Sequence, residues 1–295
     1  MAQARIGIIG GSGLGDAFAS EVGGEQVTLD TPFGAPSGPI QCTNWQGIDI
    51  AFISRHGPGH RHNPSTVPYR ANIHALKQLG VTHILASGAT GSLREAIEPR
   101  HLVIADQVID KTSKRTSTFF EQGIVAHVEF AEPFCPMLRG LLNDAGSKVA
   151  TTVHPKGTYV CMEGPAFSTI AESNMHRGWG GDLIGMTCMP EAKLAREAEM
   201  CYALVALPTD YDCWRPHEPG MTKTALLKEI IGHLQAATAN AIDLLKHAIP
   251  QVAKRVDEPC ACRSSLELAI WSDKSKVDAA ALEPVRLLVG KYFDT

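Results

Sequence analysis

Two aspartates after the middle of the chain offer the clearest chemistry in this sequence. Asp210 and Asp212 stand in the run Thr209-Asp210-Tyr211-Asp212, after an apolar segment, 201–207, that is typical of a buried strand. An unpaired buried carboxylate is costly, so such a pair must be hydrogen-bonded, protonated or both. A carboxylate and a carboxylic acid together suit the edge of a planar heterocycle with an exocyclic amine and a ring nitrogen, as in adenine. By itself, the pair equally fits a loop with a capping or turn role.

A glycine-rich turn and a basic pair indicate a small anion. The segment Gly10-Gly11-Ser12-Gly13 follows a short apolar strand, and glycines there let backbone amides approach an oxyanion. The spacing is not a dinucleotide fingerprint, because Asp16 stands where a further glycine is required. Arg55 and His56 end another apolar strand and suit phosphate binding. The two features together predict a phosphate site, whereas each alone fits a ligand-free turn or a surface pair.

Composition restricts the partners of this protein. The 295 residues suit one large domain, and no low-complexity linker divides them. The formal charge is −4, with 27 basic and 31 acidic residues interspersed, which disfavours nucleic acid and an anionic membrane as partners. The N-terminus has no secretory pattern, and no stretch reaches about 18 uninterrupted apolar residues. We therefore expect a cytoplasmic protein with small, soluble partners.

The 8 cysteines are expected to be free thiols in that compartment. The pair Cys260 and Cys262 is an exception, because a disulfide between them closes a small, strained and redox-labile ring. A zinc site lacks a second matching pair in the sequence, and two inert thiols are the simpler interpretation.

The order of apolar patterns predicts an α/β fold. Segments 39–43 and 48–54 are typical of a hairpin, and Thr169 and Glu172 have capping-box spacing. The other strands are predicted at 5–10, 82–87, 102–109, 158–161 and 201–207. Helices are predicted at 68–79, 133–145, 169–177, 190–200 and 222–248, with a helical tail over 263–295.

Seven motifs, in one consistent order, resemble those of the purine nucleoside phosphorylase family, and in particular its methylthioadenosine phosphorylases. They are Ile8-Ile9-Gly10-Gly11-Ser12-Gly13-Leu14, Thr31-Pro32-Phe33-Gly34, Arg55-His56-Gly57, Gly91-Ser92-Leu93, Glu163-Gly164-Pro165, Gly185-Met186-Thr187 and Thr209-Asp210-Tyr211-Asp212. The resemblance implies one nucleoside phosphorylase domain over 1–250, with a mixed, partly barrel-like sheet flanked by helices. Residues 251–295 are then a connector and a helical tail with the Cys-x-Cys pair.

The resemblance also implies an activity in methionine and purine salvage. Inorganic phosphate attacks the anomeric carbon of S-methyl-5'-thioadenosine and yields adenine and 5-methylthioribose 1-phosphate. Phosphate is a co-substrate, and neither a metal nor an organic cofactor is needed. The expected assembly is a homotrimer or a dimer of trimers.

Site residues follow from the same resemblance. The expected phosphate site consists of Ser12, Arg55, His56, Gly88, Ala89 and Thr187, although Gly88 replaces a hydroxyl residue and so removes a donor. The expected substrate site consists of Phe167, Ser168, Met186, Thr209, Asp210, Asp212, His60 and Leu226, with His127 from a neighbouring subunit. Ala166 stands where the family usually has an arginine, and Lys223 stands where the resemblance leads us to expect a small apolar residue.

Asp210 is the expected catalytic residue. Cleavage of the glycosidic bond puts negative charge on the purine, and a raised pKa lets Asp210 protonate N7. A 6-oxopurine nucleoside or methylthioinosine phosphorylase is the nearest alternative, but the two aspartates favour a 6-amino base. A hydrolytic nucleosidase does not need the phosphate site, and a silent purine-binding protein is the alternative outside enzymes.

Overall fold

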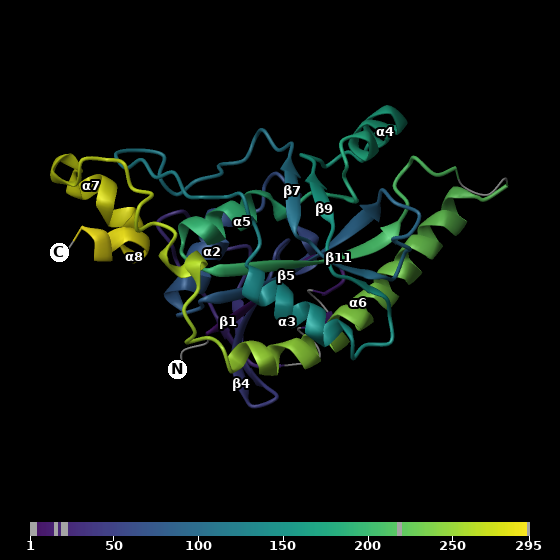
Figure 1. Ribbon diagram of the computed structural model, residues 1–295, viewed down its shortest axis with the longest axis horizontal. Helices are drawn as coiled ribbons and strands as arrows, with labels where there is room; N and C mark the ends of the chain where they lie inside the picture. The colour runs from purple at the N-terminus through teal and green to yellow at the C-terminus, as the bar shows by residue number, and fades with distance from the viewer. Residues whose placement is uncertain (1–4, 15–16, 19–22, 217–219, 294–295) are drawn as a thin grey trace.

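The computed structural model describes residues 5–14, 17–18, 23–216 and 220–293 (Figure 1). The described strands form one 11-stranded mixed sheet. They are β1 (Ile6–Gly10), β2 (Glu25–Val27), β3 (Ile40–Trp45), β4 (Ile48–Ser54), β5 (His83–Ser92), β6 (Leu102–Ile104), β7 (Gln107–Asp110), β8 (Val153–His154), β9 (Thr158–Cys161), β10 (Leu183–Gly185) and β11 (Cys201–Asp210). The helices are α2 (Tyr69–Gln78), α3 (Pro136–Gly146), α4 (Ile170–Gly178), α5 (Cys188–Glu197), α6 (Lys223–Ala253), α7 (Ala279–Leu282) and α8 (Arg286–Val289).

Strand β5 is the branch point of the sheet. Its partner along one edge is β11, which runs parallel to it from His83 onward. On the other edge, β1 pairs with β5 up to Ala86, and β10 pairs antiparallel from Gly91. Within the described chain, Ser87–Thr90 therefore lack a strand neighbour on this edge, and their backbone faces the gap between β1 and β10.

Alternating side chains of the strands fill two cores on opposite faces of the sheet. Ile9 belongs to the core that contains residues of α2 and α5, and its neighbour Ile8 to the core with residues of α3 and α6. Leu204 and Val205 of β11 divide in the same way. This is the period-two pattern of strands that are buried on both faces by helices. The predicted α/β fold with a mixed sheet flanked by helices is confirmed.

Most predicted elements form, but their bounds differ in two informative places. The segment 102–109 is not one strand: β6 pairs with β11 and β8, and β7 pairs with β9. The break lies at Asp106, whose carboxylate accepts a hydrogen bond from the Gly157 amide instead of continuing the strand. Strand β11 extends beyond the predicted 207 to Asp210, so Thr209 and Asp210 are strand residues.

The predicted hairpin and capping box are confirmed. β3 and β4 pair antiparallel from Trp45 and Ile48, and the Thr169 and Glu172 side chains each cap the other's backbone N–H. The short strands β2, β8 and β10 were not predicted, because two to three residues carry no readable period. After α6 the chain has short helical segments, and α7 and α8 lie together at the left of Figure 1. In the described part of the chain, no helix is long and apolar enough to cross a bilayer.

Candidate active site

A cavity of about 680 Å³ opens at the branch point of the sheet. Its walls come from the glycine turn after β1, the end of β4, the unpaired stretch of β5, the start of α5, the end of β11 and one face of α6. All six residues predicted for phosphate line it: Ser12, Arg55, His56, Gly88, Ala89 and Thr187. The sheet topology therefore brings together residues that lie up to 175 positions apart in the chain (187 − 12).

Arg55 is anchored by the protein itself. Its guanidinium, 0% exposed, donates through Nε and Nη2 to both carboxylate oxygens of Glu191, at 2.6 and 2.7 Å. Nη1 donates to the Ser87 carbonyl at 2.7 Å, and Tyr202 donates to Glu191 at 2.8 Å. Glu191 is thus a buried protein partner of Arg55, which the sequence analysis did not identify. Three of five N–H groups are used, so two remain for an anion in the cavity.

His56 is a neutral imidazole at physiological pH. Burial and then the positive charge of Arg55 lower the pKa of His56 to about 4. Nδ1 lies 2.8 Å from the His62 carbonyl, so Nδ1 carries the proton and donates, which leaves Nε2 as an acceptor. The ring stacks on His60, with centroids 4.1 Å apart. His56 therefore offers a lone pair, suited to a phosphate that still carries a proton.

Two glycines in the cavity wall differ in the space around them. A Cβ at Gly11 would lie 2.7 Å from both Arg55 Nη1 and the Ser87 carbonyl, so a side chain there collides with the anchored guanidinium. A Cβ at Gly88 would have more room, because the nearest atoms to it are Thr187 Oγ1 at 3.6 Å and Arg55 Nη1 at 4.0 Å. Gly11 is required by close approach, whereas Gly88 leaves room for a side chain.

Asp210 faces the cavity from the end of β11, where the pairing register with β5 shifts after Pro208. Thr209 Oγ1 donates to Oδ2 and the Asp212 backbone N–H donates to Oδ1, both at 2.7 Å. Burial nevertheless raises the pKa of Asp210. The backbone of Asp212 adopts a left-handed conformation, with φ 52°, as aspartate tolerates in turns. Together these features hold a carboxyl group with an elevated pKa at the cavity wall.

The predicted substrate residues divide into two groups. Those that line the cavity are Phe167, Ser168, Met186, Thr209, Asp210, Asp212, His60 and Leu226. Leu226 is joined by Ile230 and Leu234, one apolar face of α6. Lys223 stands one turn before Leu226 on the same side of α6, but it is exposed and does not line the cavity. His127 is not in this chain's cavity wall: its backbone N–H donates to the Ala269 carbonyl, and its ring contacts Trp271.

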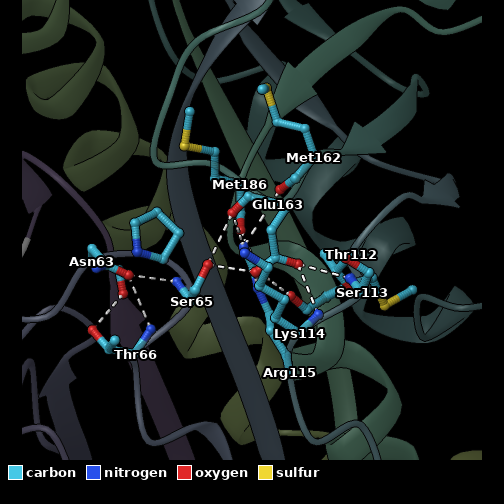
Figure 2. Close-up of polar contacts among 12 residues, drawn as sticks. Asn63, Ser65, Thr66, Thr112, Ser113, Lys114, Arg115, Met162, Glu163 and Met186 are labelled. Atoms are coloured by element: carbon cyan, nitrogen blue, oxygen red, sulfur yellow. Dashed lines mark hydrogen bonds and ion pairs between the residues drawn. The ribbon is translucent and has the colours of Figure 1, made fainter.

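Arg115 and Glu163 support the cavity (Figure 2). The sequence analysis did not identify Arg115 and named Glu163 only as part of a motif. Arg115 Nη1 donates to the carbonyls of Met186 and Met189 at 2.5 and 2.6 Å, and Nη2 donates to the Glu163 carbonyl at 2.5 Å. The Glu163 carboxylate accepts hydrogen bonds from the Ser65 hydroxyl and, at 2.7 Å, from the backbone N–H of Ser113. Although burial opposes it, these bonds hold the pKa of Glu163 at about 2. No periodic pattern marks Arg115 in the sequence, since it lies in a polar loop.

A second cavity, of about 970 Å³, adjoins the first across Thr209 and Asp210. Glu95, Arg100 and Glu229 line it, and the glycine turn and Arg55 do not. The smaller cavity is therefore the one in which the base and anion residues meet.

Residues 5–250 match the family model of the Phosphorylase superfamily. The chain belongs to this superfamily. Among curated relatives of this phosphorylase, "S-methyl-5'-thioadenosine phosphorylase" of Synechocystis sp. is 49% identical over 99% of this chain and 89% of the relative. The protein of the same name from Thermosynechococcus vestitus is 48% identical over 98% of this chain and 99% of the relative. The family resemblance expected from the motifs is thus confirmed.

Solved structures agree with this membership of the phosphorylase superfamily. A methylthioadenosine phosphorylase from an antarctic soil metagenomic library superposes with a TM-score of 0.88 at 42% identity, over 98% of this chain and 99% of the other. The Schistosoma mansoni methylthioadenosine phosphorylase in complex with adenine superposes with a TM-score of 0.82 at 33% identity. The match covers 91% of this chain and 99% of the other.

Proposed function

We propose that this phosphorylase catalyses phosphorolysis of S-methyl-5'-thioadenosine to adenine and 5-methylthioribose 1-phosphate. The observation that carries the proposal is one cavity that holds an anion side, with Ser12, Arg55 and Thr187, and a carboxyl side, with Asp210. The names of the full-length relatives support the substrate. A phosphate-binding side is of no use to a hydrolase, and a carboxyl pair suits a 6-amino purine better than a 6-oxo purine.

The reaction needs one bond to form, one to break and one proton to move. A phosphate oxygen bonds to the anomeric carbon as the bond from that carbon to N9 breaks, and the electron pair passes to the purine. Asp210, whose pKa is raised by burial, acts as the general acid and gives a proton to N7. Asp212 accepts from the exocyclic amine. In this proposal the reaction uses no metal and no organic cofactor.

The 5' end of the substrate lies against α6. The apolar wall there consists of Leu226, Ile230 and Leu234. It offers a 5'-hydroxyl no hydrogen-bond partner but accommodates an apolar methylthio group.

The proposal includes a homotrimer or a dimer of trimers in the cytoplasm, with His127 placed in a neighbour's 5' pocket. An apolar surface around His127 supports an interface there: Val125, Leu268 and Trp271 are 50, 91 and 74% exposed in the single chain. Sedimentation should show three or six chains. Fully active protein that sediments as one chain of 31.7 kDa would exclude shared sites.

Adenine release, with and without phosphate, tests the reaction. Methylthioadenosine, adenosine and inosine are each incubated with the enzyme, and free base and sugar phosphate are quantified. We expect phosphate-dependent cleavage with methylthioadenosine preferred over adenosine, and little cleavage of inosine. Equal base release in phosphate-free buffer would indicate a nucleosidase, preference for inosine a 6-oxopurine enzyme, and adenine binding without turnover a silent binding protein.

A further inference from the structure

Four cysteines from three separate parts of the chain meet far from the cavity. The Sγ atoms of Cys135, Cys201, Cys260 and Cys262 all lie within 4.8 Å of one another. Cys135 directly precedes α3, Cys201 is the first residue of β11, and the other two belong to the Cys-x-Cys pair after α6. Three of the side chains are buried and Cys260 is half-buried. All four are free thiols.

The spacing of the four sulfur atoms suits tetrahedral coordination. A zinc ion with four thiolates at about 2.3 Å has its sulfur atoms about 3.8 Å apart. Cys135 Sγ and Cys260 Sγ are 3.7 Å apart. Even four sulfur atoms at the outer limit of 4.8 Å lie about 2.9 Å from a common centre, so a shift of about 0.6 Å per side chain completes the coordination.

The backbone around the cluster holds it in place. The Cys135 N–H donates to the Tyr202 carbonyl at 2.8 Å, and the Cys201 N–H donates to the Thr82 carbonyl at 2.9 Å. In the tail, the Arg263 N–H donates to the Cys260 carbonyl at 2.9 Å and begins the 3-10 turn that aims Cys262 inward. Two ligands therefore stand on the sheet and the start of α3, and two on the tail.

Positive charge is available to balance such a centre. Four thiolates and one Zn²⁺ carry a net charge of two minus. Arg263 follows Cys262 directly, and Arg196 donates to the Glu132 carbonyl at 2.6 Å, three residues before Cys135. Arginines near both halves of the cluster lessen the cost of burying this charge.

We propose that Cys135, Cys201, Cys260 and Cys262 bind one structural zinc ion that fastens the C-terminal tail to the sheet. Four protein ligands close the coordination sphere, so this zinc has no open position for a substrate. It lies at the opposite end of β11 from Asp210, about 30 Å away at the usual rise per strand residue (Figure 1). The site is thus separate from the reaction and independent of the proposed substrate.

The metal content of the enzyme, purified under reducing conditions without chelator, tests this proposal. We expect one zinc per chain by elemental analysis, and in Co²⁺-reconstituted protein the intense absorption of a tetrahedral thiolate complex. Cys260→Ser, at the half-buried ligand, should weaken zinc binding by at least about tenfold and lower Tm. Cys42→Ser, at a half-buried cysteine outside the cluster, should keep the zinc.

Three results would overturn the proposal. One is a reduced enzyme that binds neither zinc nor Co²⁺, which leaves four inert thiols. Another is a denatured, unreduced enzyme with four titratable thiols in place of all 8 cysteines, which shows two disulfides. The third is full zinc retention in Cys260→Ser. Where that variant fails to fold, the Co²⁺ spectrum of the unaltered protein decides.

Discussion

Arg55 and Glu191 form a buried, bidentate ion pair next to the candidate phosphate site. The pair joins the end of β4 to α5, with side chains 0 and 1% exposed. It fixes the plane of the guanidinium, so the two free N–H groups have a defined direction before any anion arrives.

Breaking this pair should therefore cost stability as well as phosphate affinity. Glu191→Gln leaves a buried positive charge without its partner and should lower the free energy of unfolding by about 3–5 kcal/mol, measured by urea denaturation. The double change of Arg55 and Glu191 to Met should cost less than the sum of the single changes. Glu258→Gln, in the exposed pair with Arg255, is the control and should cost about 0–1 kcal/mol. Equal losses at both sites would contradict this account.

The choice of base should depend on Asp210. Asp210→Asn removes the proton donor for N7 and presents an amide that suits a 6-oxo group, so kcat/KM for methylthioadenosine should fall by roughly 10² to 10⁴. Activity with inosine should fall far less or rise. The ratio of the two efficiencies is the decisive measurement, because a folding defect lowers both. If the ratio of the two kcat/KM values changed by less than about threefold, ~0.7 kcal/mol, Asp210 would not be the residue that recognises the base.

Gly88→Ser should restore the missing hydroxyl donor to the phosphate site. The space around Gly88 accepts the side chain, so we expect unchanged folding and about 0.5–1.5 kcal/mol of tighter phosphate binding, seen as a lower KM for phosphate. Gly11→Ser is the matched control, because its side chain meets Arg55 and the Ser87 carbonyl and should cost about 1–3 kcal/mol of stability. If Gly88→Ser and Gly11→Ser lowered stability equally, the inference that Gly88 has more room for a side chain than Gly11 would be wrong.

Acid should destabilise the enzyme partly through His56. The folded pKa of about 4 lies below the ordinary 6.5, so between these values the unfolded chain binds a proton that the folded chain does not. This contribution is complete above pH 6.5 and is lost as the pH falls toward 4, by at most about 1.4 kcal/mol per pH unit. His56→Asn should flatten the dependence of unfolding free energy on pH in this window. An unchanged slope would show that folding does not lower the pKa of His56.

The sequence by itself determined the alternation of elements, the glycine turn and the Asp-x-Asp pair, because these depend on local periodicity and backbone sterics. The hairpin, the capping box and the approximate bounds of the longer elements follow from contacts within about ten residues. The family resemblance rests on motifs that are each contiguous in the chain.

Tertiary structure alone decided which of these residues meet. The branch at β5 places Gly88 opposite Gly11, and Glu191, 136 positions after Arg55, became the partner that the local sequence did not reveal. In the same way, Cys135 and Cys201 join the Cys-x-Cys pair, although nothing in their spacing marks them as ligands. Such contacts depend on strand order and helix packing, which are set by the burial of the whole core and leave no short-range pattern in the chain.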